Sequence, residues 1–281
     1  MFVSLDNDPR PYDWGSMTDI AELLGRKPSG RPEAELWLGD HPGCPARIVN
    51  PAAVGGHRTL ADWTTAEPEA ALGTASGGRL PFLLKVLAAA TPLSLQVHPT
   101  IEQAQAGFEQ EDNAGISFDA PHRNYRDANH KPELIVALSD SFEALCGFRA
   151  IEESREIAAR LVELARDTGV SRTGLSELAS LLKSSESPEA AVKWLLGENP
   201  VVAELTALVE SGLVPSGLPD HPEVLPLVAR LALQYPEDPG IAVALLAQPG
   251  YDPTWRRALP AGRQHPRVPG WPRDRAYVCV G

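Results

Sequence analysis

Residues 93–98 alternate apolar and polar side chains, and Pro99 ends the alternation. Successive side chains of a β-strand point to opposite faces, so the pattern predicts a strand with one apolar and one polar face. Ser94, Gln96 and His98 share the polar face, which brings an amide and an imidazole together at the end of the strand. The chain is therefore expected to contain a β-sheet with a strand end that can coordinate a ligand.

A second polar cluster precedes an apolar run at residues 129–138, which read Asn-His-Lys-Pro-Glu-Leu-Ile-Val-Ala-Leu. Glu133 stands at the entrance to this second predicted strand. A histidine at a strand end is, by itself, more often a hydrogen-bonded surface residue than a ligand. The two strand ends together offer Gln96, His98 and Glu133, and amide, imidazole and carboxylate donors suit a divalent ion such as zinc. Catalytic zinc sites have about three protein ligands and an open position.

Short strands and helices alternate in the rest of the first 149 residues. A capping box, Thr-Ile-Glu-Gln at residues 100–103, predicts a helix that runs to about Glu111. The other predicted elements are a helix at 17–24 capped by Ser16, a strand at 34–42, helical spacing at 60–72, a strand at 82–87 buried on most of its surface, and strands at 133–138 and 142–148. Proline and glycine separate these neighbouring strands, which favours an antiparallel sandwich.

The periodicity changes at Ala150, where apolar residues begin to recur at helical spacing. Ile157, Leu161 and Leu164 lie on one predicted helix face, and Gly169 suits the C-cap of that helix. Similar spacing recurs at 175–182, 190–196, 201–209 and 224–231. We interpret this helical block as simple packing, because it contains no cofactor motif. Neither GxGxxG nor GxxxxGKS/T occurs in the chain, so dinucleotide and P-loop chemistry lack support.

The composition is that of an ordinary soluble protein: of 281 residues, 43% are hydrophobic and 22% are charged. There is no long uncharged apolar run and no basic-then-apolar leader, so neither a membrane-spanning helix nor a signal peptide is expected, and the predicted location is cytoplasmic. Cys44, Cys146 and Cys279 are odd in number and far apart, which argues against a disulfide framework and a cysteine-built zinc site. A net charge of -12 argues against nucleic-acid binding, although a local basic pocket would still suit a small anion.

Several motifs together resemble one enzyme family. They are Glu-Leu-Trp-Leu-Gly at 35–39, Leu-Lys-Val-Leu at 84–87, Ser-Leu-Gln-Val-His-Pro at 94–99, Asn-Tyr-Arg-Asp at 124–127 and Asn-His-Lys-Pro-Glu at 129–133. In this order they resemble the type I phosphomannose isomerases, also called mannose-6-phosphate isomerases. The resemblance covers residues 1 to about 247, including the helical block.

The resemblance implies a mainly β fold with an α-helical insertion, that is, a cupin jelly roll, incomplete in this chain, plus a helical domain. Residues 1–149 would be the N-terminal part of the jelly roll with the metal site, and 150–236 the inserted helical domain. Residues 237–281 would begin the return to the jelly roll and continue as an aberrant tail. In this family a Gln and a His two residues apart, a Glu and a later His hold one zinc ion. The first three map onto Gln96, His98 and Glu133.

The implied activity is the interconversion of mannose 6-phosphate and fructose 6-phosphate by a monomer with one Zn²⁺ per chain and with no nucleic-acid or membrane partner. Such an isomerase moves a proton between adjacent carbons through an enediol-like intermediate, and a divalent ion stabilises the developing charge. Lys131, beside Glu133, is the candidate cation or proton carrier, and a solvated loop lysine is its plainer interpretation. Ser94 is a candidate contact to the substrate phosphate. The identity of the base stays open.

The tail from Pro249 onwards departs from the family. It contains six prolines, six arginines and no lysine in 33 residues, and it carries +4 against -16 for the rest of the chain. Proline removes the donors of a β-ladder, so a regular sheet is not expected there. Reading residues 260–269 one base forward, with ordinary codons, gives Leu-Pro-Ala-Gly-Asn-Ile-His-Ala-Tyr-Leu, which resembles the family segment with the fourth ligand.

This coincidence suggests a frameshift between about Ala247 and Tyr251, real or from a sequencing error. His265 is then displaced by one residue from the lost ligand, and a one-residue slip turns a strand side chain to the opposite face. The chain is accordingly expected to be inactive or weakly active. Two alternatives stay open: a metal-binding cupin of another class, such as an oxygenase, although those use more histidines, and a non-catalytic sugar-binding or interaction module.

Overall fold

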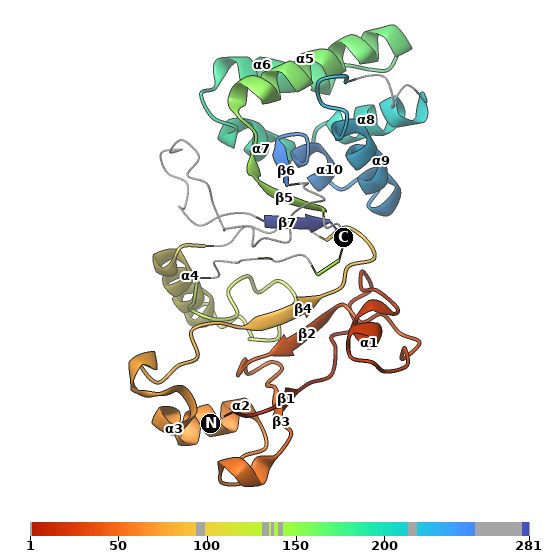
Figure 1. Ribbon diagram of the computed structural model, residues 1–281. Helices are drawn as coiled ribbons and strands as arrows, with labels where there is room; N and C mark the ends of the chain where they lie inside the picture. Colours follow the sequence, from red (N-terminus) through yellow and green to blue (C-terminus); the bar gives the residue numbers. More distant parts are fainter. Residues whose placement is uncertain are drawn as a thin grey trace. The chain divides into compact units, whose positions relative to one another are not determined.

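The structure, a computed structural model, describes residues 2–93, 99–130, 135, 138–139, 143–212, 218–250 and 277–280. The chain divides into two compact units, Met1–Pro92 with Gly281, and Leu93–Val280. The first unit combines short strands and short helices, whereas most of the second is helical (Figure 1).

The strands are short and pair antiparallel. They are β1 (Leu5–Asp6), β2 (Glu35–Leu38), β3 (Arg47–Ile48), β4 (Leu84–Leu87), β5 (Glu143–Phe148), β6 (Ala247–Gly250) and β7 (Tyr277–Val280). β1 pairs with β3, β2 pairs with β4, and β5 lies between β6 and β7. The register sets Trp37 of β2 opposite Lys85 of β4.

The helices of the first unit have at most seven residues, and those of the second reach eighteen. The α-helices are α1 (Asp19–Leu23), α2 (Leu60–Ala66), α3 (Pro68–Leu72), α4 (Ile101–Asn113), α5 (Ile151–Thr168), α6 (Thr173–Ser184), α7 (Glu189–Leu195), α8 (Val201–Glu210), α9 (Val224–Gln234) and α10 (Gly240–Val243). Two 3₁₀ turns, η1 (Pro51–Val54) and η2 (Thr74–Ser76), accompany them.

The first unit has small apolar clusters. One consists of Ile48, Val54, Leu60 and Trp63, and another of Ile20, Leu36 and Ala88. The predicted helical spacing at 60–72 is confirmed, but it is divided into α2 and α3, because Pro68 begins a new helix at its N1 position.

The helix predicted at 17–24 begins later than expected. Thr18, not Ser16, takes the N-cap position. The backbone of Ser16 bonds to Ala88 and Glu33, and Ser16 forms an isolated β-bridge with Glu33. The Ser16 hydroxyl still accepts hydrogen bonds from the amides of Thr18 and of Asp19, the first residue of α1, at 3.2 Å each.

The strand predicted at 82–87 forms only from Leu84, and the prediction that it is buried on most of its surface is wrong. Phe82 is 64% exposed and Leu84 is 55% exposed. The described pairing of β4 is to β2 along one edge, so the rest of its surface receives less cover than a central strand would.

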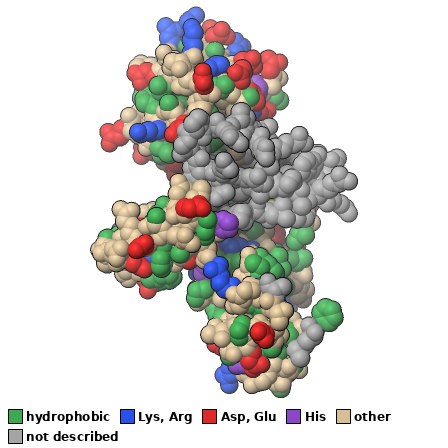
Figure 2. All heavy atoms as spheres, turned by 90° about the vertical axis from the view of Figure 1, so that its left-hand side faces the viewer, with side chains coloured by type: hydrophobic (Ala, Val, Ile, Leu, Met, Phe, Trp, Pro, Cys, Tyr) green, Lys and Arg blue, Asp and Glu red, His purple; other side chains and the backbone are tan. Residues whose placement is uncertain are grey.

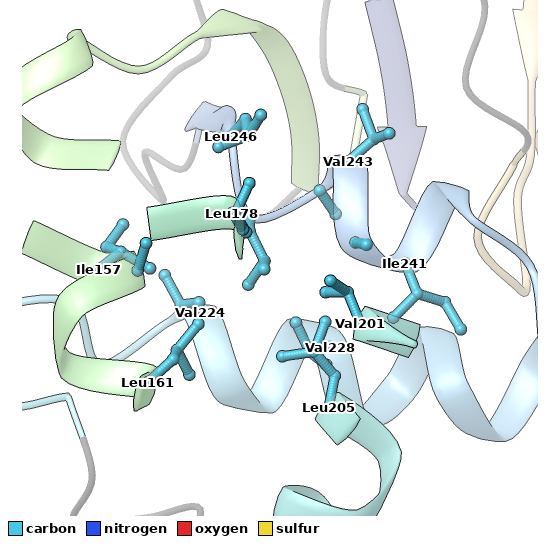
Figure 3. Packing of buried hydrophobic residues seen from close by; sticks show 14 of the residues in the cluster. Ile157, Leu161, Leu178, Val201, Leu205, Val224, Val228, Ile241, Val243 and Leu246 are labelled. Carbon is cyan, nitrogen blue, oxygen red and sulfur yellow. The ribbon is translucent and has the colours of Figure 1, made fainter. Parts of the chain in front are cut away.

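Helices α5 to α10 pack around one large apolar cluster, part of which is shown in Figure 3. Leucines and valines at helical spacing supply most of it, as the sequence predicted for 150–235, and Leu161, Leu178 and Leu205 are fully buried. Gly169 ends α5 in the left-handed conformation, which confirms the predicted C-cap. The cluster also includes residues 241–247, which follow the predicted insertion.

Within this cluster lies one buried carboxylate, Glu204 of α8, which is 3% exposed. It accepts hydrogen bonds from the backbone amides of Gly174 at 3.2 Å and Leu175 at 2.9 Å, and from the Ser171 hydroxyl at 2.8 Å. Those amides belong to the first turn of α6, whose N–H groups have no partner inside the helix. Glu204 therefore caps one helix from another.

Part of the tail forms a strand, contrary to expectation. Residues 277–280 contain no proline, and as β7 they pair with β5. Pro249 lies in β6 at the edge of this sheet, where a missing N–H is tolerated. The frameshift itself stays a prediction.

The helical block is confirmed, but the described residues form more helix than strand, so the structure is mixed rather than mainly β as predicted. The cupin jelly roll and the domain boundaries stay predictions. None of the helices in the described ranges has the length and apolar character needed to cross a membrane. On the face shown in Figure 2, acidic and basic side chains are interspersed over the described residues.

Candidate metal centre

The five residues predicted for the site all lie outside the described residues. They are Ser94, Gln96, His98, Lys131 and Glu133. The structure does describe the chain on both sides of them, from Pro99 through α4 to His130. Two approaches to the candidate centre are thus described: one begins at Pro99, directly after His98, and the other ends at His130, three residues before Glu133.

The first approach is the start of α4. Its predicted capping box is confirmed: the Thr100 hydroxyl accepts from the Gln103 amide at 3.2 Å, and the Gln103 side chain accepts from the Thr100 amide at 3.0 Å. Hydrogen bonds from the backbone amide of Glu102 itself, and then from the Thr100 hydroxyl, lower the pKa of the Glu102 carboxyl. His130 contributes to a smaller extent. The start of α4 is therefore fixed by its own capping groups.

The second approach is anchored by a buried arginine. The side chain of Arg123 is 2% exposed and donates three hydrogen bonds of 2.7 Å, to the carbonyls of Tyr125 and Ile116 and to the Asp112 carboxylate. Its guanidinium carbon lies 4.9 Å from the ring centroid of Phe108. Every guanidinium nitrogen thus has a fixed partner, and the loop after α4 is held to the helix.

Glu111 of α4 completes this anchor. Its carboxylate accepts from the amides of Asn124 at 3.0 Å and Tyr125 at 2.8 Å, and from the Asn124 side chain at 3.2 Å. The Asn124 amide above all, with help from Tyr125 and the Arg123 charge, lowers the pKa of the Glu111 carboxyl. We call Glu111 and Arg123 the clamp.

The ring of Tyr125 lies against Gly107 of α4. A Cβ built at Gly107 would be 2.5 Å from the Cζ of Tyr125, which is closer than real contacts allow. Glycine normally destabilises a helix interior by about 1 kcal/mol relative to alanine. At residue 107 this cost is accompanied by the close packing of the Tyr125 ring, for which a larger residue leaves no space.

Lys85 and Trp37, which the resemblance motifs contain but the predicted site does not, form a polar face of the β2–β4 pair. The Lys85 ammonium lies 4.6 Å from the Trp37 ring centroid and 3.5 Å from the Glu35 carboxylate. The Trp37 indole donates to Glu35 at 2.8 Å. The alternation of the sequence places Glu35 and Trp37 on one strand face. This alternation is the sequence pattern from which the contact between these two side chains could have been predicted.

Within the described ranges, no group of three or more His, Cys, Asp or Glu side chains is arranged to hold a metal ion. The predicted ligands therefore keep their assignment from the sequence alone.

Residues 2–151 match the family model of the type I phosphomannose isomerase catalytic domain. The chain belongs to this family. All five predicted site residues fall inside the matched range, which begins in the first unit and ends at the start of α5.

Curated relatives carry the same family name. The chain is 46% identical to the mannose-6-phosphate isomerase of Escherichia coli K12 over 153 residues, which are 53% of this chain and 38% of that protein. It is 34% identical to the mannose-6-phosphate isomerase of Bos taurus over 250 residues, 82% of this chain and 56% of that protein. The chain thus spans less than two thirds of the length of these relatives.

Solved structures of the family are similar across almost the whole chain. The Salmonella typhimurium mannose 6-phosphate isomerase bound to fructose 6-phosphate and zinc has a TM-score of 0.73 at 29% identity, over 99% of this chain and 65% of that one. A mannose 6-phosphate isomerase bound with zinc and yttrium has a TM-score of 0.75 at 28% identity, with the same coverage.

Proposed function

We propose that this chain carries the zinc-binding catalytic domain of an isomerase that interconverts mannose 6-phosphate and fructose 6-phosphate. The observation that carries the proposal is the match of residues 2–151 to the type I catalytic domain, with the five candidate site residues inside it. Relatives named for this activity, and a family structure that holds both zinc and fructose 6-phosphate, support the proposal.

The donor set suits zinc. Gln96, His98 and Glu133 offer one amide oxygen, one imidazole and one carboxylate, a borderline-hard set that leaves room for substrate oxygens. When bound, zinc would polarise the carbonyl and hydroxyl oxygens of the sugar and stabilise negative charge on them.

The remaining roles fall to neighbouring side chains. Lys131 would place a positive charge beside the reacting oxygens or carry a proton between the adjacent carbons. Ser94, which the alternation of residues 93–98 predicts on the same strand face as Gln96 and His98, would donate a hydrogen bond to the substrate phosphate. Both roles are proposed from sequence position and from the resemblance.

The 281-residue chain by itself is expected to turn over slowly or not at all. Gln96, His98 and Glu133 would supply three of the four ligands that the resemblance implies, and the proposed frameshift would displace His265 by one residue from the fourth. The proposal is thus a family-type site with weakened metal binding. A monomer without nucleic-acid partners stays the expectation.

The test is to load the purified chain with zinc and follow ¹³C-labelled mannose 6-phosphate by NMR. Slow formation of fructose 6-phosphate that disappears in the His98→Ala variant would support the proposal. Conversion with iron but not zinc would favour another cupin class. Binding of mannose 6-phosphate without conversion would favour a non-catalytic sugar-binding module. A chain that binds neither zinc nor mannose 6-phosphate would overturn the proposal.

A further inference from the structure

We propose that the edge of β5 opposite β6 is a strand-accepting surface. Residues 277–280 of the chain itself, as β7, occupy this surface, and the same strand of a second copy of the chain can take their place. β7 then serves as a strap that keeps the chain monomeric. The inference concerns association between chains, and it does not depend on the proposed zinc site.

β7 pairs with β5 in a regular register. Four consecutive residues of β5, from Glu143 to Cys146, pair antiparallel with Val280 to Tyr277 without a shift (Figure 1). On the other side of β5, the register to β6 is interrupted between Leu145 and Phe148, and Pro249 of β6 has no N–H to donate. The edge that β7 covers is therefore the more regular template for a strand.

β5 is also fixed from its other sides. Leu145 is 3% exposed and belongs to the apolar cluster of the helical block, and Ala144 is 4% exposed. The amide of Arg149, which follows β5, donates to the carbonyl of Leu246, which precedes β6, at 2.9 Å. Removal of β7 would thus leave β5 in place with a row of unpaired backbone donors and acceptors. Such a row is the template to which an extended strand adds.

The sequence of the strap suits an added strand. The six prolines of the tail lie between residues 249 and 272, and residues 273–281 contain none. Tyr-Val-Cys-Val at 277–280 includes one aromatic and two β-branched residues, which favour a strand. Main-chain hydrogen bonds supply most of the affinity of an added strand, so the same segment can pair with its own β5 or with that of another copy.

The connection within the chain decides between these two partners. Residues 251–276 connect β6 to β7, so β7 meets its own β5 at an effective concentration on the order of 1 mM. The strand of a second copy competes only near that protein concentration, or when β7 is removed. Exchange of an identical element between copies is domain swapping, which builds a dimer from the contacts of the monomer.

The experiment opens the edge by combining Val278→Pro with Cys279→Pro. Only alternate amides of an edge strand face its partner, so one of the two prolines removes a ladder donor in either case. Val278→Thr with Cys279→Thr is the matched control, because it keeps both amides and the strand propensity. The probe is a fluorescein-labelled peptide of residues 273–281 that carries Cys279→Ser, and fluorescence anisotropy measures its binding.

The double-proline variant is expected to bind the peptide at least about tenfold more tightly than the wild type and the threonine control, whose own β7 competes with the peptide. Equal peptide binding by all three proteins would overturn the proposal. So would a double-proline variant that keeps the helical circular dichroism of the wild type and binds no peptide.

A disulfide trap covers the case in which the double-proline variant does not fold. Ala144 pairs directly with Cys279, and opposite residues of antiparallel strands have Cα atoms about 4.5–5.5 Å apart, which a disulfide can bridge. Ala144→Cys is combined with Cys44→Ser and Cys146→Ser, so that the new thiol and Cys279 are the only two in the chain.

Oxidation of this variant at micromolar concentration is expected to link the two thiols within one chain of 30.2 kDa. Oxidation after refolding at about 1 mM is expected to give a disulfide-linked dimer as well, because the second copy then competes for the edge. Non-reducing electrophoresis separates the two products. The absence of the link within one chain, or of the dimer after refolding, would overturn the proposal.

Discussion

Two buried glutamates make nearly the same hydrogen bonds in very different surroundings. Glu204 lies inside the apolar cluster of helices α5–α10, where it caps α6. Glu111 lies on α4, and among the described residues the hydrophobic clusters include none from 99–130. The helical block is therefore held by apolar burial, and the α4 segment by a few directed bonds.

This difference separates stability from geometry. Apolar burial is non-directional, so the helical block gains stability from its total buried area and tolerates small changes of shape. Directed bonds give less net stability but fix the chain path, because each donor must meet its own acceptor. The α4 segment, which is next to the candidate ligands in the sequence, is the one held by directed hydrogen bonds.

The largest effect is expected from removing core volume in the helical block. Leu205→Ala, at a fully buried position, should lower the free energy of unfolding by about 2–5 kcal/mol through lost burial and a residual cavity. Urea unfolding followed by circular dichroism measures this loss. Leu233→Ala on α9, 86% exposed, is the control and should change little. Similar losses at both positions would refute a core built on Leu205.

Arg123→Met should come next, with a loss of about 2–3 kcal/mol, because it leaves the carbonyls of Ile116 and Tyr125 without their donor. The same urea experiment applies. Arg160→Met removes an ion pair with Glu163 whose side chains are 43% and 58% exposed, and it should cost about 0.5 kcal/mol or less. A loss for Arg123→Met no larger than for Arg160→Met would show that the clamp does not hold the loop.

Gly107→Ala tests the close approach of the loop. The new methyl group meets the Tyr125 ring, so a loss of about 1–2 kcal/mol is expected despite better helix propensity. In a Tyr125→Ala background the same substitution should be neutral or stabilising. A double-mutant cycle from urea unfolding measures this coupling, and additive effects would contradict the contact.

The two capping boxes offer a matched pair with a smaller effect. Thr100→Ala at α4 and Thr59→Ala at α2 should each cost about 1 kcal/mol, because each removes the acceptor of an N-terminal amide. Only Thr100→Ala should also weaken zinc binding, measured by competition with a chromophoric chelator. Equal zinc affinities for the two variants would argue against α4 as the support of the ligand segments.

The smallest effect concerns pH. Hydrogen bonds that the carboxylate accepts from the Asn124 amide, and then from the Tyr125 amide, hold the pKa of the Glu111 carboxyl below its ordinary value of 4.5. The carboxyl thus adds stability above that value, which is lost as pH falls through the lower folded-state pKa. The difference in urea midpoint between wild type and Glu111→Gln should shrink between about pH 5 and pH 3. A constant difference would contradict this linkage.

Sequence reasoning succeeded where a pattern repeats. The helical block follows from apolar spacing over many turns, and the start of α4 follows from Thr100 and Gln103. It failed where tertiary context decides. Ser16 has the residue type of an N-cap, but Thr18 takes that position and the Ser16 backbone forms an isolated β-bridge with Glu33. Residues 82–87 read as buried because periodicity cannot tell how many partners a strand has.

The candidate site likewise has one part that the sequence predicts and one part that it does not. Its donors could be named from strand alternation and from the family resemblance, whereas the clamp could not. Arg123 stands in a polar segment that reads as an ordinary solvated loop, and nothing in the sequence links it to Glu111 twelve residues earlier. Only the fold shows that this arginine is buried.

The most direct test of the account is the zinc stoichiometry of the purified 281-residue chain, measured by elemental analysis after gel filtration in zinc-containing buffer. A zinc site built from Gln96, His98 and Glu133 should hold one zinc per chain in the wild type and lose it in Gln96→Ala, His98→Ala and Glu133→Ala. Wild-type chain that holds no zinc, or zinc that persists through all three substitutions, would contradict it.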